Sequence, residues 1–305
     1  MRWDDFRRSD NVEDDRDAGG GFGGGGSGIQ FGGGGLGIGT VIMLGLIGWA
    51  TGIDPRILIG GAELISGSGQ HRQQPYQPSA RRTGAPSDQM GQFVAAVLGN
   101  TEDTWGEIFQ AGGQQYRAPR QRLYRGGEQG GCGFAQAAMG PFYCPTDQRI
   151  YLDTSFFNDM QTRFHGCSGK ACEFAEAYVI AHEVGHHIQN LLGTLPKARS
   201  EQRAAGSRAE ANRIQVRVEL QADCYAGVWA HHSDQRWNSI EPGDVEAALQ
   251  TAAAIGDDRL QQQSRGTVVP DSFTHGTSAQ RQRWFTNGLK AGTLSACDTF
   301  AAASL

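Results

Sequence analysis

The sequence predicts an α+β domain, mostly helical with a small sheet, that occupies residues 86–305. Short segments with strand character lie early in this region, at 121–125, 141–144 and 149–152. Longer segments with helical periodicity follow them, and strands grouped ahead of a run of helices are typical of α+β domains. The expected helices lie around 93–98 and 105–109, and then at 172–192, 203–232, 243–263 and 278–290.

The chain ahead of this domain has a different composition. Residues 1–35 combine mixed charge with a glycine tract, which predicts a disordered, solvated tail. Residues 36–53 form an uncharged apolar run of about 18 residues, enough for one transmembrane helix. Trp49, near one end, fits an interfacial anchor, and the alternative is a buried, glycine-rich core helix. Residues 54–85, rich in Gly, Ser, Gln and Pro, predict a linker.

Six cysteines all follow the apolar run, and an even number suits disulfide bonds in an oxidising compartment. Separation along the chain favours Cys132 with Cys144, Cys167 with Cys172, and Cys224 with Cys297. Six cysteines allow 15 connectivities, and buried free thiols in a cytosolic protein are the alternative. Arginines placed ahead of the apolar run favour a cytoplasmic amino terminus. We therefore expect a single-pass protein whose domain is periplasmic or extracellular.

Net charge argues against one class of partner. The chain carries a formal charge of −5 and has a pI near 5.9. A nucleic-acid-binding protein needs a basic face, and no run of lysines or arginines supplies one. We expect no nucleic-acid partner.

The segment 181–193, AHEVGHHIQNLLG, contains the motif HExxH. His182 and His186 are four residues apart, so on a helix both imidazoles can face one metal ion. Glu183 then lies beside the metal without binding it and can act as a general base. An apolar stripe at helical spacing supplies the helix, and His187 lies on a different face. The alternative is two surface histidines on an ordinary helix.

A third metal ligand is expected because catalytic zinc usually keeps three protein ligands and one open position. Glu219 and Asp223 lie four residues apart in VELQADCYAG, so one could bind the metal while the other accepts a histidine N–H. Residues 214–220 alternate like a strand, but the surrounding segment lacks proline and is too long for one strand. Glu201 and Glu210 are weaker candidates for the third ligand. The alternative without a metal role is that Glu219 is an ordinary, solvated surface glutamate.

The chain resembles the bacterial family of putative neutral zinc metallopeptidases. The resemblance covers nearly its whole length and rests on MRWDDFRRSDNVED, GPFYCPTDQRIYLD, YVIAHEVGHHIQN, ELQADCYAGVWA and THGTSAQRQRWF. More distantly, it is similar to gluzincins, including the membrane zinc peptidases that process prenylated proteins. That likeness implies Glu219 as the third ligand and Asp223 as the partner of His182. It also implies that His275 stabilises an oxyanion and that Arg281 holds the site together, although the pattern has proline where this chain has Gly276.

These observations together predict a zincin-like metallopeptidase domain behind one transmembrane helix, anchored in a bacterial inner membrane. One Zn²⁺ per chain would be held by His182, His186 and Glu219, while Glu183 activates zinc-bound water to cleave a peptide or protein. The strand at 150–152 would hold the substrate in extended form. A zinc-binding, non-catalytic membrane scaffold or assembly factor and a metal-free interaction protein are the alternatives.

Overall fold

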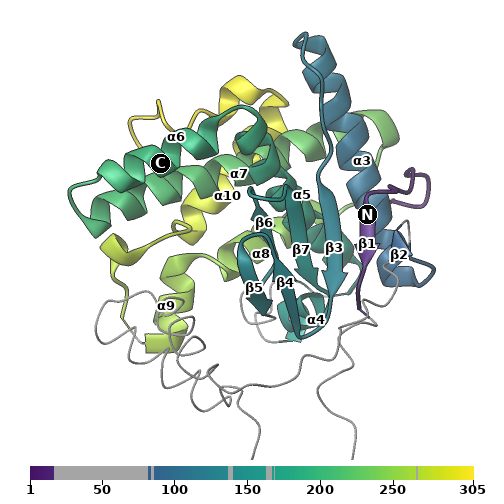
Figure 1. Ribbon diagram of the computed structural model, residues 1–305, viewed down its shortest axis with the longest axis horizontal. Coiled ribbons are helices and arrows are strands. Elements are labelled where there is room, and N and C mark those ends of the chain that lie inside the picture. The colour runs from purple at the N-terminus through teal and green to yellow at the C-terminus, as the bar shows by residue number, and fades with distance from the viewer. Residues whose placement is uncertain (17–81, 84–85, 137–139, 163–166, 168, 266) are drawn as a thin grey trace, which may run out of the picture. The chain divides into compact units, whose positions relative to one another are not determined.

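The computed structural model describes residues 1–16, 82–83, 86–136, 140–162, 167, 169–265 and 267–305. The apolar run at 36–53 lies outside these ranges, as do the glycine tract and most of the predicted linker. Among the residues that are described, no helix is long and apolar enough to cross a membrane. The described part is an α+β fold, with helices packed around a small sheet (Figure 1), as the sequence predicts.

The main sheet has five strands in the order β2-β1-β3-β7-β6. They span Arg82–Thr83 (β2), Val12–Asp14 (β1), Arg120–Tyr124 (β3), Arg149–Asp153 (β7) and Phe142–Cys144 (β6). β1, β3 and β7 run parallel, whereas β2 and β6 are antiparallel edge strands. The three predicted strands are confirmed as β3, β6 and β7. A separate hairpin, β4 (Gly127–Gly130) with β5 (Gly133–Gln136), has no apolar alternation to predict it.

Eight α-helices lie within the described residues. They are α3 (Gln89–Ala111), α4 (Ser155–Thr162), α5 (Cys172–Leu191), α6 (Thr194–Ala204), α7 (Arg208–Trp237), α8 (Asp244–Ala254), α9 (Asp257–Arg265) and α10 (Ser278–Ala291). Short 3₁₀ turns cover Gly169–Ala171, Pro270–Ser272 and Leu294–Cys297. The predicted helices at 172–192 and 278–290 are confirmed as α5 and α10, and the two short early ones form the single helix α3.

Two long predicted helices are each divided in the structure. The segment 203–232 covers the end of α6 and most of α7, because Ser207 caps the new helix by accepting a hydrogen bond from the Glu210 N–H. The segment 243–263 divides into α8 and α9 at Gly256. A Cβ at Gly256 would lie 2.6 Å from the backbone nitrogen of Ser278, so the chain turns where only glycine fits.

Residues 1–16 belong to the domain, and the prediction of a disordered tail is wrong for them. β1 pairs with β2 and β3, while Phe6 and Val12 are buried in the main core. Helix α3 accommodates this segment at Gly99, where an added Cβ would lie 2.2 Å from the Arg7 carbonyl oxygen. The amino-terminal segment therefore completes the sheet.

The charged residues of the amino-terminal segment, whose composition predicts a solvated stretch, form ion pairs in the fold. Glu13 is 4% exposed, and its carboxylate accepts hydrogen bonds from Arg122 and Arg149. Burial alone would raise the pKa of Glu13, but Arg149 and the other arginines around it lower the pKa to about 2. These partners lie 109 and 136 residues further along the chain, so local composition does not reveal them.

The sheet also constrains how the chain could meet a membrane. Asp14 pairs with Arg82, so the chain leaves and re-enters the domain at neighbouring points. A chain that crossed a bilayer once between these points would put β1 and the rest of the sheet on opposite sides. The expected arrangement, with a cytoplasmic amino terminus and a periplasmic or extracellular domain, does not fit this sheet. β2 lies within the predicted linker at 54–85, so the domain also includes residues ahead of 86.

Helices α5, α7 and α10 pack closely and position the site (Figure 1). Two glycines allow α7 and α10 to approach each other. A Cβ at Gly227 would lie 2.1 Å from the Phe285 carbonyl oxygen, and one at Gly288 would lie 1.9 Å from that of Cys224. Larger residues there would force the helices apart. This contact brings Arg281, on α10, against Asp223, on α7.

Three disulfide bonds stabilise the described domain. The pairs are Cys132–Cys144, Cys167–Cys172 and Cys224–Cys297, which confirms the pairing favoured by sequence separation. No cysteine is left free. The alternative of buried free thiols is therefore wrong.

Candidate metal centre

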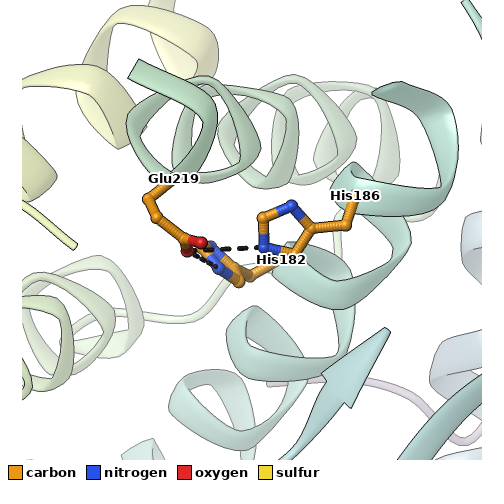
Figure 2. Close-up of side chains that lie close together, drawn as sticks. All are labelled: His182, His186 and Glu219. Carbon is orange, nitrogen blue, oxygen red and sulfur yellow. Dashed lines mark hydrogen bonds and ion pairs between the residues drawn. The ribbon is translucent and has the colours of Figure 1, made fainter. Parts of the chain in front are cut away.

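The structure brings His182, His186 and Glu219 together, although they come from two helices (Figure 2). α5 carries both histidines on one face, and α7 crosses α5 so that Glu219 faces them. One carboxylate oxygen of Glu219 lies 3.3 Å from Nε2 of His182 and 3.4 Å from Nε2 of His186. The possible ligand atoms all lie within 4.8 Å of one another. Such a cluster can hold a single metal ion.

Hydrogen bonds fix which nitrogen of each imidazole faces the cluster. His182 donates from Nδ1 to Asp223 at 2.8 Å, and His186 donates from Nδ1 to the amide oxygen of Gln189 at 2.9 Å. The Gln189 amide is itself oriented, because its nitrogen donates to the Val218 carbonyl oxygen at 2.7 Å. Both Nε2 lone pairs are therefore free for a cation. Two neutral imidazoles and one carboxylate fit Zn²⁺ at a catalytic site.

Electrostatics also favour a cation here. Burial would raise the pKa of the Glu219 carboxyl, but His186 and His182 beside it hold the pKa well below its usual range. Burial would lower the pKa of His186, yet Glu219 raises it. The cluster therefore attracts positive charge to the imidazole Nε2 atoms, and a divalent cation would supply that charge in place of protons.

Glu183 lies beside these ligands, one residue after His182. It is 7% exposed, and burial raises the pKa of its carboxyl while the two histidines lower it. A carboxylate whose pKa is raised by burial is better matched to proton transfer near neutral pH than an ordinary surface glutamate.

Asp223 joins the metal-binding histidine to the rest of the core. Its side chain is fully buried, and its two oxygens accept hydrogen bonds from Arg281 at 2.9 and 2.8 Å. The hydroxyl of Tyr178 donates to the same carboxylate at 2.6 Å. Burial would raise the pKa of Asp223, but Arg281 and His182 lower it, so the group stays anionic. The structure thus places Asp223 and Arg281 where the resemblance implies.

His275 lies at the border of the site with its side chain 51% exposed. Its Nδ1 is 3.3 Å from one oxygen of Asp257, and the other oxygen accepts backbone N–H groups of Thr274, His275 and Gly276. Gly276 has φ +89°, which proline cannot adopt, so the loop differs here from the proline-containing pattern. Partial desolvation of the ring would lower the pKa of His275, but Asp257 and Glu219 raise it above its usual value.

The alternative ligands lie elsewhere. Glu201 is partly exposed and pairs with Lys197 at 3.9 Å, and Glu210 accepts the Gly206 N–H at the start of α7. His187 faces away from the cluster and is fully buried. Sequence reasoning did not identify three supporting residues, namely Tyr178, Gln189 and Asp257. The sequence marks these residues only by their positions: Tyr178 and Gln189 lie on the helix that carries the motif, and Asp257 lies at the start of α9.

Comparison with known proteins agrees with this geometry. The profile of the family described as "Putative neutral zinc metallopeptidase" matches residues 1–300. The "Uncharacterized protein YpfJ" of Escherichia coli (strain K12) is 48% identical over 300 residues, 98% of this chain and 99% of that protein. The "Uncharacterized protein Rv2575" of Mycobacterium tuberculosis is 45% identical over 241 residues, 75% of this chain and 78% of its own. No solved structure matches. The chain belongs to the putative neutral zinc metallopeptidase family.

Proposed function

We propose that the protein is a zinc-dependent peptidase that hydrolyses peptide bonds in a peptide or protein substrate. The observation that carries this proposal is the cluster of His182, His186 and Glu219 with the buried carboxylate of Glu183 next to it. A purely structural zinc site is usually closed by a fourth cysteine or histidine and needs no base. Within the described residues, the cluster has three ligands and an adjacent base.

The chain's own residues can carry out the proton transfers. When bound, zinc in such a site acts as a Lewis acid that polarises a carbonyl and acidifies water. Glu183 accepts the proton of the attacking water and delivers it to the leaving amine. Asp223 keeps His182 oriented, and His275, held by Asp257, offers its second ring nitrogen to the developing oxyanion.

An extended substrate would pair with β6 instead of the strand expected from the sequence. The expected strand, at 150–152, belongs to β7, which already has β3 on one side and β6 on the other. β6 is the edge strand next to α5, and in the described part of the chain its outer edge is unpaired. Edge strands accept extended peptides by backbone hydrogen bonding.

A matched pair of substitutions tests the activity. Glu183→Gln keeps the shape of the side chain but removes the base, so we expect peptide hydrolysis to fall by about 10²–10⁴-fold while bound zinc stays stoichiometric. Glu176→Gln makes the same change at a buried glutamate on the same helix and should leave activity unchanged. Equal hydrolysis by wild type and Glu183→Gln would instead support a non-catalytic zinc scaffold.

We also propose that residues 36–53 attach the protein to a membrane, but with an orientation that differs from the one expected from the sequence. β1 and β2 flank the segment 17–81 and pair with each other, which supports placing the amino terminus and the domain on the same side of the membrane. Three disulfides support an oxidising compartment for that side, such as the bacterial periplasm.

A further inference from the structure

Helix α5 contacts the edge strand β6, and the side-chain hydrogen bonds between them that the structure shows are made by Tyr143. Glu183, His187 and Asn190 follow one another at four and three residues and so share a face of α5. The Tyr143 hydroxyl lies 3.0 Å from Nδ1 of His187 and accepts the Asn190 amide N–H at 3.1 Å. Two side chains of the metal-binding helix therefore hold one residue of the edge strand against the helix face that carries Glu183.

The direction of each hydrogen bond in this group is determined. Nε2 of His187 lies 2.6 Å from the carbonyl oxygen of Arg117, which can only accept, so Nε2 carries the proton. Nδ1 must then accept from the Tyr143 hydroxyl, which in turn accepts from Asn190. His187 is fully buried, and burial lowers its pKa to about 4, so the ring is neutral near pH 7. Both ring nitrogens and the phenol have partners.

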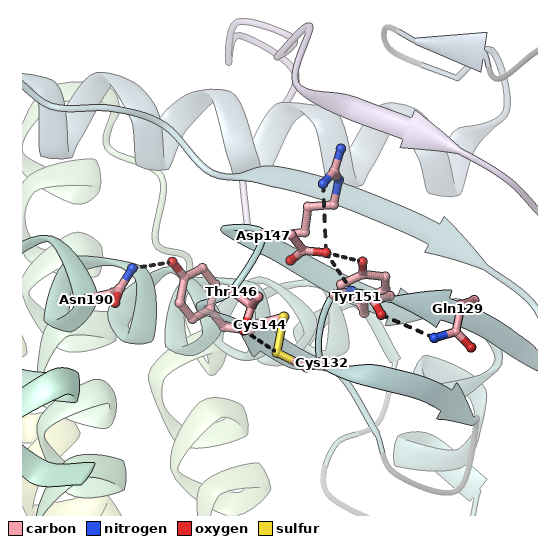
Figure 3. The surroundings of a disulfide bond; sticks show 11 residues. Gln129, Cys132, Cys144, Thr146, Asp147, Tyr151 and Asn190 are labelled. Atoms are coloured by element: carbon pink, nitrogen blue, oxygen red, sulfur yellow. Dashed lines mark hydrogen bonds and ion pairs between the residues drawn. A yellow bond between two sulfur atoms is a disulfide. The ribbon is translucent and has the colours of Figure 1, made fainter. Parts of the chain in front are cut away.

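The same residue belongs to the strand at the free edge of the sheet. Tyr143 lies opposite Ile150 in the middle of β6, the strand at the end of the sheet that has no further partner among the described residues. The next residue, Cys144, is bonded to Cys132 in the β4–β5 hairpin, and Asn190 reaches the strand from the other side (Figure 3).

We propose that Tyr143 is a positioning residue that fixes where β6 lies relative to the metal-binding helix α5. Its phenol, held by His187 and Asn190, keeps the strand against the face of α5 that carries Glu183. An extended peptide paired with the free edge then presents a peptide bond to the base. This inference rests on the proposed peptidase function, but the position of the strand can be measured without any activity.

The first test measures the strand itself in the full-length, zinc-loaded protein. Tyr143→Phe removes only the hydroxyl, and we expect backbone amide exchange at 142–144 to accelerate about tenfold, as for one lost hydrogen bond. The control is Tyr124→Phe on β3, whose buried hydroxyl has no hydrogen-bond partner among the described residues and should leave exchange at β6 unchanged. Unchanged exchange in Tyr143→Phe would overturn the proposal.

The second test measures substrate length. Tyr143→Phe should lower kcat/KM about tenfold for extended peptides of seven or more residues and less than twofold for short ones, since only the former reach along the edge. His187→Asn keeps an acceptor near Nδ1 and should retain more of this preference than His187→Leu, which has similar volume and no acceptor. An equal loss at all lengths would refute a positioning role. Faster exchange at β6 combined with an inactive wild type would refute the peptidase function and leave the contact intact.

Discussion

The buried carboxylate of Asp223 has two separable roles, and removing it should affect stability and zinc binding by different amounts. Asp223→Asn leaves the guanidinium of Arg281, which is 3% exposed, without its anion. Breaking a buried ion pair by removing one partner costs about 3–5 kcal/mol of unfolding free energy. The same change weakens the hydrogen bond that orients His182, whose Nδ1 lies 2.8 Å from Asp223. Loss of such a partner lowers metal affinity by about 10–100-fold.

A double substitution separates the two effects. In Asp223→Asn with Arg281→Gln no unpaired charge remains buried, so most of the lost stability should return, as measured by urea unfolding of the metal-free protein. Zinc affinity, measured by competition with a chelating dye, should stay about 10–100-fold below wild type because His182 still lacks its carboxylate partner. If zinc affinity recovered together with stability, or if Asp223→Asn bound zinc normally, the carboxylate would act on folding alone.

Three further predictions test other parts of the fold. The folded-state pKa of Glu13 is about 2 against an ordinary 4.5, so its contribution is complete above pH 4.5 and is lost as the pH falls towards 2. Wild type should therefore lose ~3 kcal/mol more unfolding free energy than Glu13→Gln between pH 5 and pH 2. Replacing Cys224 and Cys297 by serine opens a link across 73 residues and should cost ~4 kcal/mol in chemical denaturation. Cysteines introduced at the exposed positions Asp5 and Gln114 should react alike with an impermeant maleimide in spheroplasts. Labelling of only one would contradict the proposal that the amino terminus and the domain lie on the same side of the membrane.

Local spacing was sufficient for the histidine half of the site. Two histidines four residues apart on an apolar-striped helix must share a face, and the structure places His182 and His186 accordingly. The position of Glu219 was proposed only because an unbroken helix was preferred over the strand-like alternation at 214–220. The helix α7 confirms that preference. Its alignment with α5, however, depends on the packing of separate helices.

The supporting residues could not be predicted, because each acts through a partner distant in sequence. Tyr143 meets His187 across 44 residues, and Gln189 meets the Val218 carbonyl across 29. The amino-terminal strand was missed for the same reason. Mixed charge predicts solvation only while the charges lack partners, and Glu13 finds its arginines in β3 and β7. Composition describes a segment alone, whereas burial depends on what packs against it.

The order of the strands connects the amino-terminal segment to the candidate centre. β1 supports β3, β3 supports β7, and β7 supports β6, whose Tyr143 contacts His187 on the metal-binding helix α5. A sheet of this kind depends on each pairing, so displacement of β1 would expose the buried Val12 and free the arginines that Glu13 holds. The segment 17–81 begins and ends at this same β1–β2 edge. The described residues that flank this segment therefore meet the sheet at the edge opposite β6, the strand that we expect to hold the substrate.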